Sequence, residues 1–339
     1  MSFLFPSTRL LAGLLASACA ALAACSGDDR GAPPPSTLAR AVQRGAIRIG
    51  YANEAPFAYM ESHGGLTGEA PAIARVVLGR LGVPRVEGVL TEFGALIPGL
   101  LAGRFDIIAA GMYVLPERCR QVAFSRPTYG VGEAFLERAD DPRRLRGYRQ
   151  VAADPSVRLG VVAGAVQVDY ARRAGIPDSR VVVFPDVVSA VEGVQAGRAD
   201  AYAATSLTVN HVLTKVPDWN IRKVRGFRQP VLDGETVRGY GAFAFRKQDQ
   251  DLRRAFDGEL ARFIGSDEHE RLVAPFGFTR NELPGDMTAA RLCGDQAGED
   301  GRGEPQVSGA ADAPAARAAA PVATMHTAAP EDAARGRDG

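Results

Sequence analysis

The side chains of this sequence that could carry out chemistry do not form a recognisable catalytic set. Gly239, Gly241 and Ala244 fit only a loose dinucleotide-binding pattern, inside a β-rich run with no helix directly after it. An isolated acid such as Glu54 could act as a base only beside a reactive substrate. The histidines show no spacing typical of metal ligands; they are His63, His211, His269 and His326. The sequence therefore predicts no metal and no cofactor, and it favours binding over catalysis.

The N-terminal segment predicts export. An apolar run from Leu10 ends in the residues Leu-Ala-Ala-Cys at 22–25, the pattern of a bacterial lipoprotein signal. The run is shorter than the roughly 20 residues that a transmembrane helix needs. We therefore expect residues 1–24 to be removed and Cys25 to be lipidated, so that the protein works outside the cytoplasm, anchored to a membrane. The alternative is an ordinary signal peptide cut after Ala24, with Cys25 left free.

The composition and charge of the chain limit the kinds of partner that it can have. The chain has 339 residues, 46% of them hydrophobic, and a formal net charge of +1. This length and apolar content suffice for two lobes with a buried core. Acidic and basic residues are mixed along the chain, so no basic stripe is available to neutralise phosphates. A nucleic-acid partner is therefore not expected.

Two cysteines remain beyond the lipidation site, Cys119 and Cys293. A pair of cysteines in an exported protein is more often bridged than free, because the compartment is oxidising. We expect a disulfide between them, which would join the end of the folded C-terminal segment to the N-terminal lobe. The alternative is two free or buried thiols.

The middle of the chain alternates short β-rich runs with helical patterns, which predicts α/β lobes. Helices are expected at 71–81, 93–101 and 252–264, with others that start near Val166, Val187 and Ser206. Two βα series joined by two crossings predict two lobes that close around a cleft. The expected strands are 47–51, 86–90, 106–110, 133–136, 159–162, 181–184, 201–204 and 242–245.

The domain organisation follows from these patterns. We expect lobe 1 at 38–129 and 241–293, and lobe 2 at 130–240. Residues 25–37, with their run of prolines, form a tether behind the lipid. Residues 294–339 are poor in large apolar side chains and cannot offset their ordering entropy, so we expect a disordered tail.

Several segments resemble family 3 of the solute-binding proteins of ABC importers. The resemblance covers about residues 38–280. It implies a two-lobed periplasmic-binding-protein fold of type II, in which two crossover strands form the hinge and the ligand lies between the lobes. It also implies a monomer that delivers a small solute to the membrane subunits of an ABC permease. The segments are IRIGYANEAPF at 47–57, GLTGE at 65–69, RFDIIAAGMYVLPER at 104–118, VAFS at 122–125, GRADA at 197–201 and AFAFRK at 242–247.

The resemblance also implies an anion site. In this family the arginine of the Pro-Glu-Arg segment holds the ligand carboxylate, and the matching residue is Arg118. A planar guanidinium can hold a carboxylate through two parallel charge-assisted bonds. Backbone amides of Gly111 to Tyr113 are expected beside it. Further amides are expected from a helix start in lobe 2, at Gly164, Ala165 and Val166.

The cation site departs from the pattern of the amino-acid binders. They place an acid five residues after the aspartate that matches Asp200, where this chain has Thr205. A threonine cannot balance a primary ammonium, whereas aromatic faces attract a delocalised cation. The chain instead resembles the family members that bind ectoine and hydroxyectoine, a ring amidinium with a carboxylate. That likeness implies a cage for the cation made by Glu54, Phe57, Phe93 and Tyr113.

Three alternatives stay open. The same fold could bind a polar amino acid or a betaine. A few relatives are similar to dehydratases that act on cyclic carboxylates, and Glu54 would then be a proton-transfer group. The protein could also report its ligand to a receptor, although the sequence has no fused signalling domain.

Overall fold

The structure is a computed structural model that describes residues 34–232 and 234–294. The predicted lipoprotein signal, Cys25, the first part of the expected tether and residues 295–339 of the expected tail lie outside the described residues. Within the described part, no helix is both long and apolar enough to cross a membrane.

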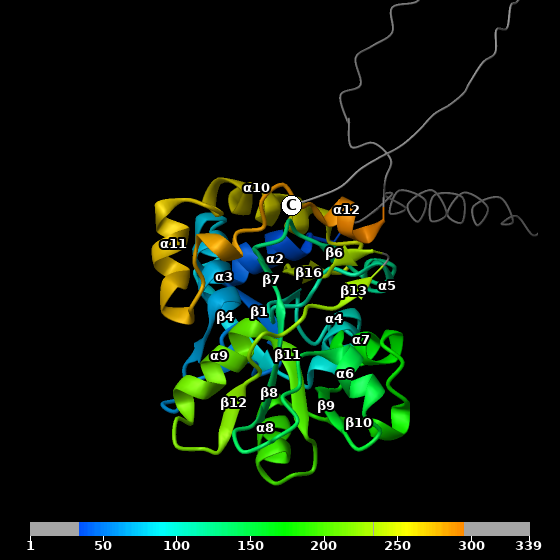
Figure 1. The fold of residues 1–339 in the computed structure, drawn as a ribbon. Helices are drawn as coiled ribbons and strands as arrows, with labels where there is room; N and C mark the ends of the chain where they lie inside the picture. The colour runs from blue at the N-terminus through cyan, green and yellow to red at the C-terminus, as the bar shows by residue number, and fades with distance from the viewer. Residues whose placement is uncertain (1–33, 233, 295–339) are drawn as a thin grey trace, which may run out of the picture. The chain divides into compact units, whose positions relative to one another are not determined.

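A first sheet contains strands from both ends of the described chain, in the order β4-β1-β5-β16-β6 (Figure 1). Strand β1 runs parallel to β4 and β5, whereas β16 is antiparallel to β5 and β6. Helices α2 (Thr37–Arg44) and α3 (Glu69–Arg80) pack on this sheet, α10 (Gln250–Phe263) packs against both of them, and α11 (Asp267–Val273) packs against α3. The strands are β1 (Ala46–Tyr51), β4 (Arg85–Leu90), β5 (Ile107–Ile108), β6 (Ala123–Phe124) and β16 (Ala244–Phe245).

A second sheet has the order β10-β9-β11-β8-β12. Strand β9 is parallel to β10 and β11, and β8 is antiparallel to β11 and β12. Its helices are α6 (Tyr148–Ala153), α7 (Gln167–Arg173), α8 (Val187–Gln195) and α9 (Ser206–Lys215). The strands are β8 (Glu133–Arg138), β9 (Leu159–Val162), β10 (Val181–Phe184), β11 (Ala201–Thr205) and β12 (Ile221–Lys223).

The chain passes between the two sheets twice, through β7 (Tyr129–Val131) and β15 (Gly239–Gly241). These two strands pair antiparallel to each other, with Tyr240 opposite Gly130. This is the two-strand hinge that the sequence predicts. Short pairs complete the strands: β2 (Tyr59–Met60) with β3 (Leu66–Thr67), and β13 (Val231–Leu232) with β14 (Glu235–Thr236).

Helix α10 begins two residues before its predicted range of 252–264, and two other predicted helices differ at prolines. Helix α3 begins at Glu69 and not at Pro71, which leaves the proline in the first turn. Residues 93–101 form a short 3₁₀ turn (Phe93–Ala95) followed by α4 (Leu96–Leu101), which places Pro98 in the first α-helical turn. A proline is tolerated there because the first amides of a helix have no intrahelical acceptor. Strand β5 is also shorter than the predicted 106–110.

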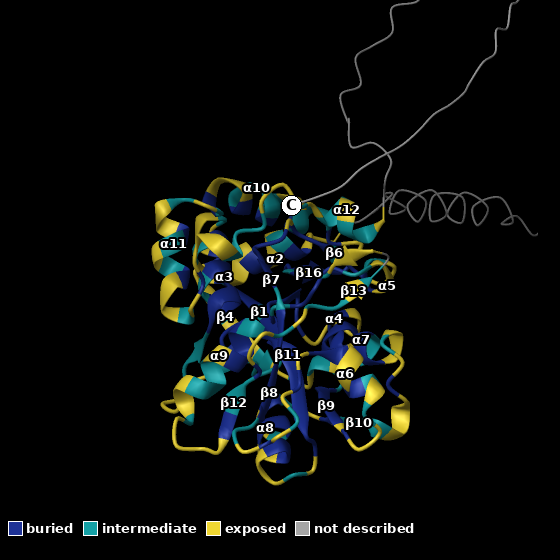
Figure 2. Cartoon of the chain, in the orientation of Figure 1, coloured by how far each residue is buried: buried dark blue, intermediate teal, exposed yellow. Residues whose placement is uncertain are grey.

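The core lies where the sheets meet their helices. Figure 2 shows β8, β9 and β11 buried, whereas the outer faces of α9, α10 and α11 are exposed. Strands β8, β9 and β11 carry apolar residues on both faces, as expected for a sheet covered by helices.

The expected disulfide is present. It joins Cys119 at the end of α5 (Pro116–Cys119) to Cys293 at the end of α12 (Ala289–Cys293). The two cysteines are 174 residues apart in sequence, so the bridge ties the last described helix to the first sheet's side of the molecule.

Candidate ligand-binding site

A small cavity of about 30 Å³ lies between loops of the two sheets. This volume suits about two water-sized molecules, so a ring-shaped solute can enter only if the walls move apart. Most of the predicted site residues line this cavity. Gly164 is not among the lining residues, but its carbonyl accepts a hydrogen bond from Arg118, which is. The lining residues are Glu54, Phe57, Phe93, Gly111, Tyr113, Arg118, Val162, Ala165, Val166, Gln167, Tyr202, Ala204 and Thr205.

Arg118 spans the cavity. It lies in the short helix α5 and is 8% exposed. Its Nη1 donates to the Tyr113 carbonyl at 2.9 Å, and its Nη2 donates to the Gly164 carbonyl at 3.0 Å. Desolvation lowers the pKa of Arg118, but a guanidinium stays protonated in proteins. Of its five N–H groups, the other three have no acceptor among the described residues and can hold an anion.

One of the predicted amide donors of lobe 2, Ala165, is already used within the protein. The Ala165 amide donates to the Val162 carbonyl at 3.1 Å, so the turn itself uses it. Gly164 offers its carbonyl to Arg118. A side chain there is excluded, because φ is +75° and an added Cβ would lie 2.6 Å from the Gly94 Cα. This glycine thereby lets the two lobes approach closely at the edge of the cavity.

The aromatic residues line the cavity and also belong to the core. Phe57 is 1% exposed, and its ring lies 5.0 Å from Tyr129 and 5.7 Å from Phe278. Phe93 has the Arg118 guanidinium carbon 5.5 Å from its ring centroid. One cation–π contact of Phe93 is therefore made with the protein's own arginine.

Glu54 is the carboxyl that faces the cavity from the first sheet's side. Thr208 of α9 donates its hydroxyl to Glu54 Oε1 at 3.0 Å, which makes a bond between the two lobes. Burial raises the pKa of Glu54 to about 7, and the Thr208 bond only partly opposes this shift. Thr205 is already committed to the protein: its hydroxyl caps α9 by accepting from the Thr208 amide at 3.0 Å.

Sequence reasoning missed a buried acid behind the cavity wall. Glu133, at the start of β8, is 2% exposed. It accepts hydrogen bonds from Gln167 Nε2 at 2.7 Å and from the Tyr113 hydroxyl at 3.3 Å. Gln229 fixes the Glu133 backbone, accepting from its amide at 2.7 Å and donating to its carbonyl at 2.9 Å. Burial raises the pKa of Glu133 to about 8. A charged residue at the start of the predicted strand 133–136, whose other residues are apolar, was the available signal.

Gln167 was also missed, although it directly follows the predicted Gly164–Val166 turn. Its amide group is committed to Glu133, so its carbonyl oxygen is left for a donor on a ligand. Val162, Tyr202 and Ala204 complete the lining residues that the sequence did not predict. They lie on β9 and β11, where only the strands themselves were recognised.

Two sheets connected by two crossing strands, with a cavity between their loops, define the class of hinged extracytoplasmic solute-binding proteins. The chain belongs to the bacterial extracellular solute-binding proteins, family 3, whose model matches residues 47–279. It is therefore an ABC-type periplasmic solute-binding protein. Among the described residues, no group of three metal-ligating side chains is arranged to hold an ion.

Individual relatives support this assignment. The chain is 37% identical to a probable amino-acid ABC transporter periplasmic-binding protein, y4tE, of Sinorhizobium fredii, over 84% of this chain and 94% of that one. It is similar to the crystal structure of EhuB in complex with hydroxyectoine, with a TM-score of 0.69, 36% identity and coverage of 76% and 97%. A cyclohexadienyl dehydratase of Pseudomonas aeruginosa is 29% identical over 49% of this chain and 61% of its own length. The first two are binding proteins, which is consistent with a protein that is not an enzyme.

The raised pKa of Glu54 predicts a pH-dependent stability. The folded state holds the Glu54 proton more tightly than the unfolded state, so this contribution is complete below pH 4.5 and is lost as the pH rises through about 7. We expect Glu54→Gln to remove this loss. The free energy of unfolding of the wild type, relative to the variant, should then fall by up to about 3 kcal/mol between pH 4.5 and 8.

Urea titrations across this pH range provide the measurement. The control is Glu87→Gln, which removes an exposed carboxyl on β4 and should leave the pH profile as it is. Parallel profiles for the wild type and Glu54→Gln would contradict the assignment of a buried, proton-holding Glu54.

Proposed function

We propose that this protein captures ectoine and hydroxyectoine outside the cytoplasm and delivers them to the membrane subunits of an ABC importer. We further propose that it acts as a monomer tethered through a lipid on Cys25. The proposal rests above all on one observation. The two formally charged residues that line the cavity are one arginine and one glutamate, and aromatic side chains line the same cavity.

This charge pair fits a zwitterion with a delocalised cation. Ectoine carries a carboxylate and a ring amidinium, so Arg118 can hold the carboxylate through its remaining N–H groups. Glu54 can accept from the ring N–H groups. An amidinium beside Glu54 would also favour the carboxylate form and lower its pKa, because an opposite charge favours ionisation. The likeness to a protein whose structure contains hydroxyectoine supports the same ligand class.

The residues expected around the ligand's cation argue against ordinary α-amino acids as ligands. Their primary ammonium is compact and strongly hydrated, and it needs several hydrogen-bond acceptors when buried. Thr205 is neutral, and its hydroxyl already caps α9. The rings of Phe57, Phe93 and Tyr113 suit a flat, weakly hydrated cation better.

Lobe closure links binding to transport. The hydrogen bonds Arg118–Gly164, Glu54–Thr208 and Tyr113–Glu133 all cross between the two lobes near the cavity, the first of them to a backbone carbonyl. A ligand that bonds to both walls stabilises the closed arrangement, because those contacts are not all available when the lobes are apart. The permease would then recognise the closed surface.

An enzymatic function is the second candidate, because Glu54 has a pKa of about 7, near that of an effective proton-transfer group. The partial similarity to a cyclohexadienyl dehydratase raises the same question. We expect no turnover when the protein is incubated with prephenate or arogenate and the products are followed by absorbance. Turnover that is lost in Glu54→Gln would replace the binding function with a catalytic one.

Arg118 provides the direct test of the anion site. Calorimetric titration of the chain from Ser26 onward should show one-to-one binding of ectoine and hydroxyectoine, and much weaker binding of arginine and glycine betaine. Arg118→Ala should weaken ectoine binding at least 100-fold, which corresponds to about 3 kcal/mol, because the ligand carboxylate would be buried without its partner.

The control for this variant is Arg120→Ala, which removes an exposed arginine directly after α5 and should leave the affinity unchanged. Equal affinity in wild type and Arg118→Ala would overturn the anion site. Binding of another solute in place of ectoine would keep the fold and change the cargo.

Glu133 is expected to act by positioning Gln167. Glu133→Leu should weaken ectoine binding about tenfold or more, since the Gln167 amide is no longer held. Glu133→Gln should stay within about threefold, because its amide oxygen can still accept from Gln167 and its amide nitrogen can donate to the Tyr113 hydroxyl. In a Gln167→Leu background, Glu133→Leu should have no further effect on the affinity.

The control is Glu137→Gln in the same strand, a buried carboxyl that pairs with Arg222 at 2.9 Å and does not line the cavity. It reports on general damage to β8. If Glu133→Leu and Gln167→Leu lower the affinity additively, the two residues act independently and the positioning role is wrong.

A further inference from the structure

A second and larger cavity is lined in part by residues of helices α6 and α7. Its volume is about 340 Å³, which is in the range of small-molecule sites. Three parts of the chain that are far apart in sequence line it: residues 146–150, residues 170, 173 and 174, and residues 228–232. Between them they contribute four arginines, and none of the lining residues is acidic. We call this cavity the four-arginine pocket; its arginines are Arg146, Arg149, Arg173 and Arg228.

The backbone holds these segments together. The Arg228 amide donates to the Arg146 carbonyl at 2.6 Å. Gly147 has φ of +148°, and an added Cβ would lie 2.8 Å from the Arg228 carbonyl oxygen. Only glycine permits this approach, so the sequence here favours bringing two arginine-bearing segments side by side.

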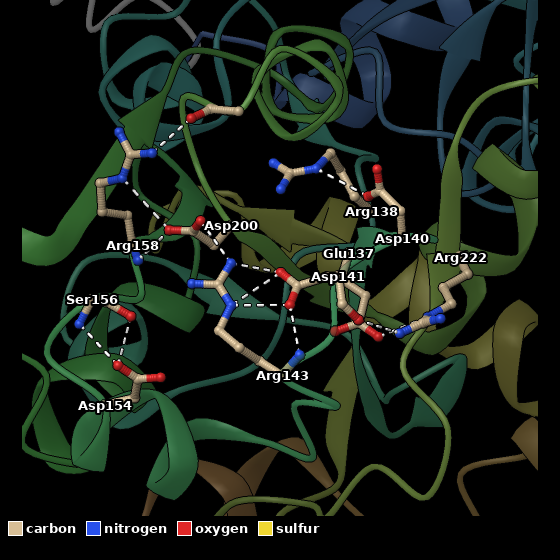
Figure 3. Close-up of polar contacts among 11 residues, drawn as sticks. Glu137, Arg138, Asp140, Asp141, Arg143, Asp154, Ser156, Arg158, Asp200 and Arg222 are labelled. Carbon is tan, nitrogen blue, oxygen red and sulfur yellow. Dashed lines mark hydrogen bonds and ion pairs between the residues drawn. The ribbon is translucent and has the colours of Figure 1, made fainter.

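The neighbouring arginines are neutralised by the protein, in contrast to those of the pocket. Figure 3 shows Arg143 bound to Asp141 and Asp200, with N–O distances of 2.5 and 2.8 Å. Arg158 also pairs with Asp200, and Arg222 pairs with Glu137. Asp141, Asp200 and Glu137 are therefore paired with arginines outside the pocket.

The four pocket arginines make no ion pair and no side-chain hydrogen bond among the described residues. All four are exposed, so water and salt screen their mutual repulsion, and an anion between them would replace this repulsion with attraction. Their planar forks match phosphate oxygens, which several arginines can share. A carboxylate offers fewer oxygens and less charge in the same volume.

We propose that the four-arginine pocket is a second binding site, for a phosphate-bearing anion with two or more negative charges. It is separate from the ectoine cavity and does not depend on the function proposed for that cavity. The phosphate could belong to a soluble molecule or to the headgroup of an anionic lipid, since both present the same oxyanion.

Pyrophosphate is the probe for the test, titrated calorimetrically into the chain from Ser26 onward at 50 mM salt. We expect one-to-one binding that weakens at least tenfold in the variant Arg146→Gln/Arg228→Gln. The matched control is Arg144→Gln/Arg172→Gln, which removes the same charge from exposed arginines that do not line the pocket and should bind as the wild type does.

Arg118→Ala separates the two proposals, because it should keep its affinity for pyrophosphate even though it loses ectoine binding. No pyrophosphate binding by the wild type, equal affinity in wild type and Arg146→Gln/Arg228→Gln, or equal weakening in the control would overturn the four-arginine site.

A second arm identifies the source of the phosphate. Vesicles of phosphatidylglycerol are sedimented with the protein, and vesicles of phosphatidylcholine serve as the neutral reference. Sedimentation with phosphatidylglycerol that pyrophosphate reverses and that Arg146→Gln/Arg228→Gln abolishes supports the site with a lipid headgroup. Pyrophosphate binding without sedimentation supports the site with a soluble phosphate.

Discussion

The arrangement of the cavity depends on the hydrogen bonds of the buried Arg118 guanidinium. A charge with 8% exposure is tolerable only when its hydrogen bonds are satisfied, and the protein satisfies two of them with carbonyls from opposite lobes. One wall therefore supplies the Tyr113 carbonyl and the other supplies the Gly164 carbonyl. The remaining donors face the cavity, so the same residue that joins the walls also carries the positive charge for an anion. Gly164 can approach Gly94 closely because Gly164 has no side chain, and this places the Gly164 carbonyl within reach of Arg118.

The same low dielectric raises the pKa values of the buried acids, which is the opposite direction to its effect on the pKa of Arg118. Burial disfavours the charged form of Glu54 and Glu133 and raises their pKa values to about 7 and 8. Near neutral pH each of them can therefore change its protonation state when its surroundings change. A cationic ligand beside Glu54 would supply the missing countercharge, whereas Glu133 is shielded behind Gln167 and Tyr113. One acid can thus contact the ligand directly, and the other can fix the side chains that do.

The sequence predicted the fold well because period-2 and helical patterns are local properties. Most strand positions and the two crossings could be read from such runs, and the disulfide followed from the count of cysteines in an exported chain. The predicted site residues came from motifs, and the structure brings nearly all of them to one cavity. Side-chain partners were not predictable, because they depend on packing between segments. Thr208 meets Glu54 across 154 positions, and Gln167 meets Glu133 across 34. The contact between the Phe93 ring and the Arg118 guanidinium is another example.

The cavity around Arg118 and the four-arginine pocket have no lining residue in common, but hydrogen-bonded side chains connect them. Gln229 lines the pocket and, through two bonds to its backbone, also holds Glu133, which in turn holds Gln167 at the cavity. Tyr148 and Tyr170 line the pocket as well, and their rings lie 6.0 Å apart within the core of the second sheet. An anion that displaced Gln229 would therefore act on the strand that positions the ligand contacts. Thermodynamic linkage makes any such effect reciprocal. If phosphate in the pocket changed the affinity for ectoine, ectoine would change the affinity for phosphate by the same factor.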